Sequence, residues 1–260
     1  GLTDAFLVKF NSNGVRQWGT YYGGTAGEEA THCATDTSGN VYLAGTTVST
    51  TGIATTGAQQ TALASAGSSD AFLVKFNSSG VRQWGTYYGG TGFDNGQSCA
   101  TDTSGNVYLA GPTKYSFAGI TTAGAHQITY AGGPDDAYLV KFNSNGVRQW
   151  GTYYGGTGAD GGQSCATDAS GNVYLTGNTG STTGIATTGA HQATRGGSSM
   201  DGFVVKFNSS GVRQWGTYYG GTNTDFGNSL ATDAITGVYL AGYTKSTTGI
   251  ATTGAHQTTF

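Results

Sequence analysis

The order of apolar and polar positions indicates short β-strands joined by tight turns. Residues 4–10 read D-A-F-L-V-K-F, and their apolar side chains alternate onto both faces of an extended chain, which is typical of a strand with both faces largely covered. Residues 11–14, N-S-N-G, predict a turn, because Asn and Ser fold the backbone through local hydrogen bonds and Gly14 suits the left-handed position of a bulged hairpin. Residues 15–22 then supply the returning strand.

A second pair of strands follows this hairpin. The sequence Gly-Gly-Thr ends the hairpin, and a polar loop of variable sequence follows at residues 26–29. Short strands are predicted at residues 31–35 and 40–44, with a tight turn between them. Residues 46–69 form a long connection that contains the sequence G-I-A-T-T-G-A. Because this sequence recurs along the chain, we expect an ordered connection that packs across one rim of the fold, and not a free linker.

The whole pattern occurs four times. The tryptophans of the returning strand are spaced 66, 66 and 65 residues apart, at Trp18, Trp84, Trp150 and Trp215. A regular period of this size indicates a repeat architecture. We therefore expect one domain over residues 1–260, made of modules at about 4–69, 70–135, 136–200 and 201–260. In the fourth module the glycine of the tight turn moves by one residue, to Gly237, so we expect a different turn type there.

Four short strands, tight turns and one long connection per module are typical of a β-propeller blade. The chain begins with the second pair of strands of one blade and ends with the first pair of another. We therefore predict an all-β fold: a propeller of four roughly 66-residue, four-stranded blades, closed by pairing of the N-terminal and C-terminal half-blades, which would hide two sheet edges. The alternative is that half-blades of different chains pair and give a larger ring or a filament.

The chain resembles the bacterial SBBP β-propeller repeat family. The motifs that carry the resemblance are D-A-F-v-x-K-x-n-x-x-G-x-x-x-w-s-T-Y-x-G-G, A-x-D-x-x-G-N-V-Y-v-x-G and a G-A-x-Q connection, and they are matched along essentially the whole chain. The resemblance implies a β-propeller on a secreted or cell-surface protein, and hence an extracellular or surface location. It implies no particular activity.

Composition and charge exclude several partners. Charged residues make up 10% of the chain, the net charge is −3, and eight of the eleven basic residues recur at equivalent positions, so no basic patch is expected and nucleic acid is not an expected partner. The chain has no long apolar run, and we expect no membrane span. It has no initiator methionine and no signal segment, which leads us to expect a mature or excised part of a longer chain.

The cysteines and histidines repeat as the modules do. Cys33, Cys99 and Cys165 share one module position, which Leu230 occupies in the fourth module. A position that accepts Leu is an apolar packing site, so we expect buried free thiols that behave as small hydrophobic side chains. Three of the four histidines, His126, His191 and His256, lie in the repeated G-A-H-Q words, with Gln59 at the equivalent position of the first module.

The sequence does not predict an enzyme. Histidines placed singly, one per module, do not form a triad, and the chain contains no H-E-x-x-H, G-x-S-x-G or C-x-x-C motif. The only cluster that breaks the repeat is Glu28, Glu29 and His32, and it is where an active site would be sought. We expect no cofactor and no metal site. The loop acids lack the spacing of a calcium loop, so calcium binding at the variable loops stays an open alternative.

Aromatic and acidic residues beside the variable loops are the candidates for ligand binding. Aromatic rings stack on the apolar faces of sugars, and tyrosine hydroxyls prefer wet positions, whereas the tryptophans are expected to pack between blades. The candidate binding residues are Tyr21, Tyr22, Tyr87, Tyr88, Tyr153, Tyr154, Tyr218 and Tyr219, together with Asp94, Asp160 and Asp225 of the loops.

Three functions are consistent with the sequence. The leading hypothesis is a non-catalytic extracellular or cell-surface scaffold that presents repeated loops to a protein or to a surface glycan. The second is a structural subunit of a filament or surface layer that self-associates through its terminal half-blades. The third, and the least favoured, is an enzyme built on a propeller.

Overall fold

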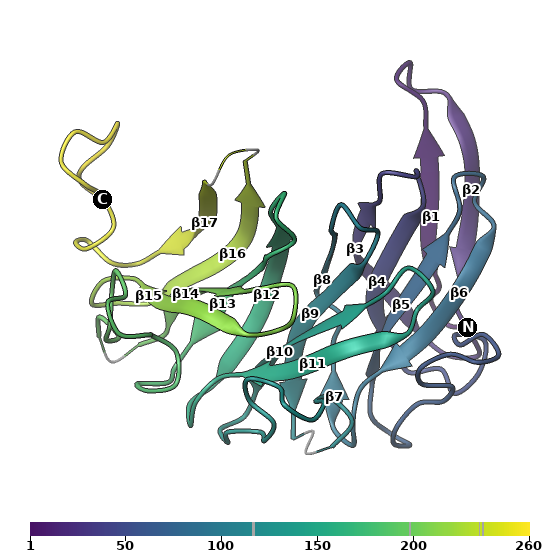
Figure 1. Ribbon diagram of the computed structural model, residues 1–260, viewed down its shortest axis with the longest axis horizontal. Coiled ribbons are helices and arrows are strands. Elements are labelled where there is room, and N and C mark those ends of the chain that lie inside the picture. Colours follow the sequence, from purple (N-terminus) through teal and green to yellow (C-terminus); the bar gives the residue numbers. More distant parts are fainter. Residues whose placement is uncertain (116–117, 198, 234, 236) are drawn as a thin grey trace.

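The chain folds entirely into β-structure. The computed structural model describes residues 1–115, 118–197, 199–233, 235 and 237–260, which form seventeen strands in antiparallel sheets and, within these ranges, no helix. Over the same ranges no helix is long and apolar enough to cross a membrane. The predicted all-β class is confirmed. The sheets follow one another along an open arc (Figure 1).

Three of the sheets are complete. They are β3 (Glu28–Thr35), β4 (Val41–Thr47), β5 (Asp70–Phe76) and β6 (Arg82–Tyr88); β7 (Phe93–Asp94) with β8 (Ser98–Thr101), β9 (Val107–Lys114), β10 (Asp136–Phe142) and β11 (Arg148–Tyr154); and β12 (Asp160–Thr167), β13 (Val173–Thr179), β14 (Asp201–Phe207) and β15 (Arg213–Tyr219). In the first and third, each strand pairs with the next strand along the chain, and in the second the first two strands both pair with the third. Each sheet combines strands of two successive modules, as the sequence predicted: the first and third take two from each, and the second takes three from one and two from the next.

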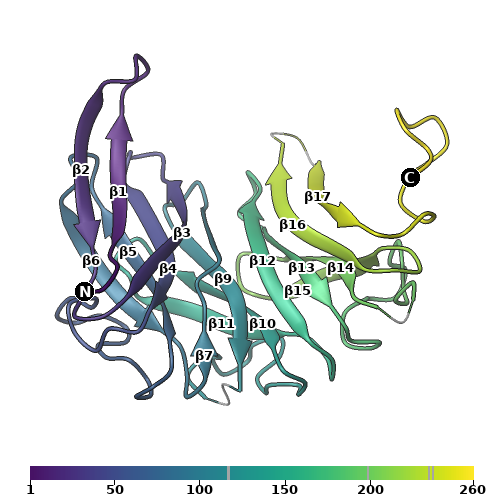
Figure 2. The ribbon, with the colours of Figure 1, turned by 180° about the vertical axis from the view of Figure 1, so that it is seen from behind.

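Two hairpins flank the complete sheets. The N-terminal hairpin consists of β1 (Ala5–Phe10) and β2 (Arg16–Tyr22), and the C-terminal hairpin of β16 (Asp225–Thr232) and β17 (Val238–Thr244). Each is a separate two-stranded sheet, and the two hairpins lie at opposite ends of the arc in both views (Figures 1 and 2). The predicted pairing of the two half-blades is therefore not present in this structure.

The first strand of each sheet is longer than predicted. It begins at Glu28, Asp160 and Asp225, inside the segments that the sequence assigned to variable loops, because the backbone ladder continues through a bulge, for example between Ala30 and His32. In the second module the same path is divided between β7 and β8. In the fourth module, Asp233 accepts hydrogen bonds from the amides of Ile235 and Gly237. In the first module, Asp36 accepts from the amides of the equivalent residues, Ser38 and Asn40. The predicted change of turn type falls on residues 234 and 236, which lie outside the described residues.

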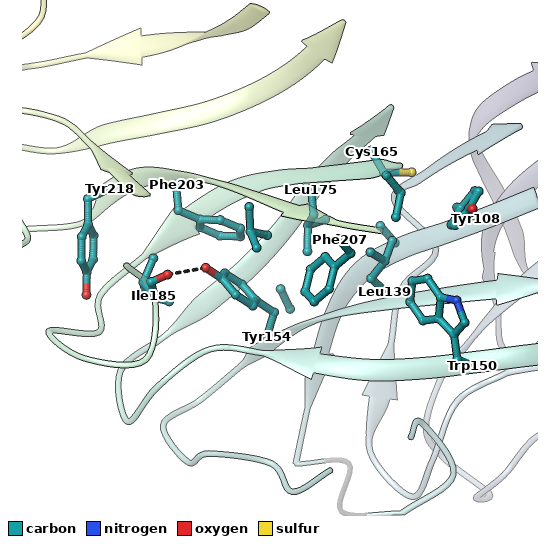
Figure 3. Packing of buried hydrophobic residues seen from close by; sticks show 14 residues of the cluster. Tyr108, Leu139, Trp150, Tyr154, Cys165, Leu175, Ile185, Phe203, Phe207 and Tyr218 are labelled. Atoms are coloured by element: carbon teal, nitrogen blue, oxygen red, sulfur yellow. Dashed lines mark hydrogen bonds between the residues drawn. The ribbon is translucent and has the colours of Figure 1, made fainter. Parts of the chain in front are cut away.

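The hydrophobic core lies between consecutive sheets. We call each of these packing contacts a junction. All seven residues of β5 and of β10 are buried, since each face meets a neighbouring sheet. The predicted covering of both faces is confirmed for these copies but is wrong for residues 4–10, because β1 lies at the end of the arc and leaves Phe6 and Phe10 exposed. Figure 3 shows the junction between the sheets of β11 and β14, where Tyr154 packs against Phe203 and Phe207.

The hairpin turn and the long connection have the predicted character. Gly14 has a φ of 76°, and the register of β1 and β2 shifts between Lys9 and Phe10, as in a bulged hairpin. The connection is ordered: the amide of Thr55 donates to Gly85 of the adjacent strand, and the side chain of Ile53 is fully buried.

Candidate functional site

Most of the tyrosines proposed as ligand contacts lie inside the fold. Six are buried, whereas Tyr219 is half-buried and Tyr21 is 80% exposed; the buried ones are Tyr22, Tyr87, Tyr88, Tyr153, Tyr154 and Tyr218. Hydroxyls among them tie the long connections to the sheets: that of Tyr154 donates to the carbonyl of Ile185 at 2.6 Å (Figure 3), and that of Tyr87 donates to the carbonyl of Ser49 at 2.9 Å. Burial raises the pKa of Tyr87 to about 12. A ligand role for these residues stays a prediction that their positions do not support.

The three loop aspartates clamp the turns that precede them. Asp94, Asp160 and Asp225 are buried, and each accepts a hydrogen bond of 2.7 Å from a glycine amide four residues earlier and another from a threonine hydroxyl nineteen residues later. Glu28 makes the equivalent bonds with Gly24 and Thr47. The sequence signal for this role is that all four modules carry a carboxylate at this position.

A second buried carboxylate lies beside each of the three aspartate clamps. A Cβ atom added at Gly89 would lie 2.6 Å from Asp94 Oδ2 and 2.8 Å from Asp70 Oδ1, so both carboxylates face this glycine. Within the described residues, the Oδ1 atoms of Asp70, Asp136 and Asp201 are buried without a hydrogen-bond partner. Sequence reasoning did not identify these acid pairs, because their members lie 24 residues apart in the chain.

The acid pairs hold protons more tightly than ordinary carboxyls do. Burial, with the nearby Asp94 carboxylate, raises the pKa of Asp70 to about 6. Burial, with the nearby Asp160 carboxylate, raises the pKa of Asp136 to about 7. In the part of the chain that the structure describes, no group of three or more His, Cys, Asp and Glu is arranged to hold a metal ion. The chemistry that the pairs offer is the uptake of a proton.

The residues considered for catalysis serve separate contacts. Glu28 is engaged in its clamp, Glu29 is exposed, and His32 meets the next sheet, where its Nδ1 lies 3.4 Å from the amide nitrogen of Cys99. Desolvation lowers the pKa of His32. In the second module, burial lowers the pKa of His126 to about 4, and its ring packs against Tyr154.

The cysteines are free thiols, as predicted, but they are not all buried. Cys99 and Cys165 are buried, and burial raises the pKa of Cys165 to about 12. Cys33 is exposed, which corrects the expectation of three buried thiols. The physical reason is that Cys33 lies on β3, the first strand of the first complete sheet, beside the less completely packed end of the arc.

The tryptophans join consecutive sheets. The indole nitrogen of Trp84 donates to the carbonyl of Ser144, in the hairpin turn of the next sheet, at 3.0 Å, and the ammonium group of Lys75 donates to the same carbonyl at 3.1 Å. The turn glycine Gly146 lies against the indole, because a Cβ added to it would be 2.8 Å from a ring atom. The same contacts occur at Trp18 and Trp150. These three tryptophans thus pack between consecutive sheets, and the sheets' assignment as blades stays a prediction.

Beside these tryptophans lie two equivalent polar grooves, which are the candidate binding site. Their volumes are about 370 and 420 Å³. Each is lined by a Lys, a Gln, a Trp and a Thr of one sheet, by a Gly-Ala segment of the connection and by the hairpin turn of the next sheet. The groove residues on the strands are Lys75, Gln83, Trp84 and Thr86 in the first groove and Lys141, Gln149, Trp150 and Thr152 in the second. Hydroxyl, amide and ammonium groups offer hydrogen bonds here, but neither lining contains a carboxylate or a histidine.

Comparison with known protein families gives no match for this chain. Comparison with curated proteins gives none either.

Proposed function

We propose that this chain is a non-catalytic scaffold, extracellular or at the cell surface, that binds a glycan in the polar grooves between its modules. One observation carries the proposal: the same groove, with the same kinds of side chain, is present at two successive junctions. We also propose that the modules are blades of a β-propeller whose ring is completed through its end hairpins.

The lining of the grooves favours a sugar over other small ligands. Sugars offer many hydroxyl groups and weakly apolar ring faces, and the grooves offer amide, hydroxyl and ammonium groups beside an indole. Equivalent sites on one rigid array also suit a polymer of repeated units, because a second binding event becomes intramolecular and raises the overall affinity.

The way in which the repeated polar side chains are used supports the non-catalytic part of the proposal. The tyrosine hydroxyls, the aspartate clamps and the indole nitrogens are engaged in contacts that hold the modules together. A nucleophile, a base and an orienting group within hydrogen-bond reach are the minimum for most catalysis, and the groove linings lack the base. The resemblance to SBBP repeats supports the extracellular or surface location.

Glycan binding by matched variants tests this proposal. The wild-type chain is screened on a glycan array, and the affinity for the best glycan is measured by calorimetry. We expect the double variant Gln83→Ala, Gln149→Ala to lose about tenfold or more in affinity, as one or two hydrogen bonds per groove are removed. Gln17→Ala is the control, since Gln17 is the equivalent residue on β2 and lines neither groove. Absence of glycan binding, or equal affinities for all three proteins, would contradict the proposal, and capture of a protein ligand in its place would redirect it.

A further inference from the structure

The N-terminal hairpin exposes apolar side chains that are buried in every complete sheet. Phe6 is 67% exposed and Phe10 is 58% exposed, whereas their counterparts on β5, Phe72 and Phe76, are buried. The two strands have the same sequence, A-F-L-V-K-F. The exposed face of β1 is therefore a surface that packs against a neighbouring sheet in the other modules but has no such neighbour here.

A groove that could receive these phenylalanine side chains lies at the other end of the arc. It has a volume of about 350 Å³ and is lined by Tyr219, Gly242 and Ile250, among others. In the first complete sheet the equivalent position is filled. The nearest ring atom of Phe72 lies 2.6 Å from the place of a Cβ on Gly45, and the ring centroids of Phe72 and Tyr22 are 5.1 Å apart. The groove beside Tyr219 is thus the place that a phenyl ring occupies at the other junctions.

The hairpin turn of β1 and β2 has a matching contact as well. At the interior junctions the turn glycine lies against a tryptophan of the preceding sheet, as Gly80 does against Trp18. A Cβ on Gly14 would meet nothing within 4 Å, and Trp215, the last tryptophan of the series, is 36% exposed. The Gly14 turn at one end of the arc and the Trp215 indole at the other could therefore form the contact that is seen at the interior junctions.

The backbone edges of β1 and β17 fix how the two ends would join. In the complete sheets, the strand equivalent to β17 pairs with the strand equivalent to β1 in one register, in which Thr46 lies opposite Ala71 and Ala44 lies opposite Leu73. The same register occurs between β9 and β10 and between β13 and β14. Applied to the ends of the arc, this register places Tyr243 opposite Ala5.

We propose that β17 of one copy of this chain pairs with β1 of a second copy, so that the two half-blades form one complete sheet. Phe6 and Phe10 of the second copy then pack against Tyr219, and its Gly14 turn covers Trp215. A second copy is the occupant because the two hairpins of one chain lie at opposite ends of the arc (Figures 1 and 2). Bringing them together would require repacking of the junctions, and closely packed cores do not deform continuously.

The segment that follows β17 gains its partners in the same step. In the first complete sheet, Gln60 of the connection donates to Asp70 and accepts from the amide of Gly89. Gln257 is the equivalent residue, and it is exposed in the single chain. Opposite a second copy, Gln257 faces Asp4 of that copy, so the pairing buries polar groups together with their hydrogen-bond partners.

Head-to-tail pairing of this kind closes into a ring or continues as a filament. Two copies supply six complete sheets and two shared ones, and a ring of that many blades lies within the known range of propellers. Sugar binding is not required for this pairing.

Sedimentation of the whole chain provides the first test. We expect a concentration-dependent mass that is a multiple of 26.4 kDa. The double variant Phe6→Ser, Phe10→Ser should weaken association by about 100-fold or more, because central aromatic anchors dominate such interfaces. Val15→Ser is the matched control on the same hairpin, since this valine is exposed, as are its counterparts Val81, Val147 and Val212. Near-wild-type melting temperatures establish that the variants fold.

Cross-linking provides the second test and identifies the occupant. One chain carries Ala5→Cys, a differently tagged chain carries Tyr243→Cys, and both carry Cys33→Ser to remove the exposed thiol. A short bis-maleimide should join the two chains, and Phe6→Ser, Phe10→Ser should abolish the product. The proposal would be overturned if the protein is a monomer at all concentrations, or if the phenylalanine variant associates as the wild type does. It would also be overturned if a chain that carries both cysteines forms cross-links only within itself.

Discussion

Strands β1 and β5 share the sequence A-F-L-V-K-F but have different environments. Every residue of β5 is buried between neighbouring sheets, whereas β1 pairs with a single strand and leaves Phe6 and Phe10 exposed. The difference cannot arise from strand propensity, which is the same for both. It shows that a blade-forming strand here is stabilised by its junctions, and that a junction requires two successive sheets.

The largest effect expected from this comparison is on core packing. Phe72→Ala removes a fully buried ring that contacts Tyr22, and we expect it to lower the free energy of unfolding by about 3–5 kcal/mol. Phe6→Ala changes the same residue type on the exposed hairpin and should cost at most about 0.5 kcal/mol. Chemical denaturation at a concentration where the chain is monomeric measures both. Equal losses would mean that the N-terminal hairpin is covered in solution.

The second effect is the pH dependence that the buried acid pairs introduce. The folded-state pKa of Asp136 is raised to about 7, so the folded protein binds more protons than the unfolded chain does, and stability falls as the pH rises through the window from about 4 to 7. From pH 5 to pH 8 this group should lower the free energy of unfolding by about 2–3 kcal/mol.

Asp136→Asn tests that assignment. The neutral amide should remove this part of the loss and raise stability at pH 8, because no charge then has to be buried. Asp4→Asn, at the equivalent but exposed position of the N-terminal hairpin, is the matched control for the amide substitution. Denaturant titrations at several pH values measure the slopes, and a wild-type profile for Asp136→Asn would contradict the assignment.

The third effect concerns the glycines of the hairpin turns. Gly14 and Gly146 both have positive φ, so an alanine at either position should cost about 1 kcal/mol of backbone strain. Gly146→Ala must also displace the Trp84 ring, which should add about 1–3 kcal/mol. Gly14 faces open space in the single chain. Thermal unfolding of the two variants under monomeric conditions measures the difference, and equal losses would indicate that Gly14 is already in contact.

The smallest effect is that of a single hydroxyl. Tyr87 donates to the carbonyl of Ser49 from a buried position, so Tyr87→Phe leaves an acceptor without its donor and should cost about 1–2 kcal/mol. Tyr21 is the equivalent residue on β2 and is 80% exposed, so Tyr21→Phe should change stability by less than about 0.5 kcal/mol. A comparable loss in both variants would show that Tyr21 is also bonded.

The sequence predicted local structure well where neighbouring residues determine it. The bulged turn at Gly14 and the ordered connection follow from residue types and their spacing. It failed where distant segments meet. The polar grooves form where a connection meets the hairpin turn of the next sheet, and the acid pair of Asp70 and Asp94 joins two strands that no local pattern connects. The tyrosines chosen as binding residues were chosen for their chemistry, whereas their burial depends on the neighbouring sheet.

The module follows from the order of residues alone: its four strands, its turns and the offset of the sheets relative to the repeat. These depend on alternation, on turn chemistry and on a period, which are all local or nearly local properties. The packing of the sheets, in contrast, sets which copies of an identical strand are buried, which carboxylates share a site and that the arc is open. Burial and curvature arise from the packing of whole sheets against each other, and identical sequences cannot encode the difference between a sheet that has two neighbours and one that has a single neighbour.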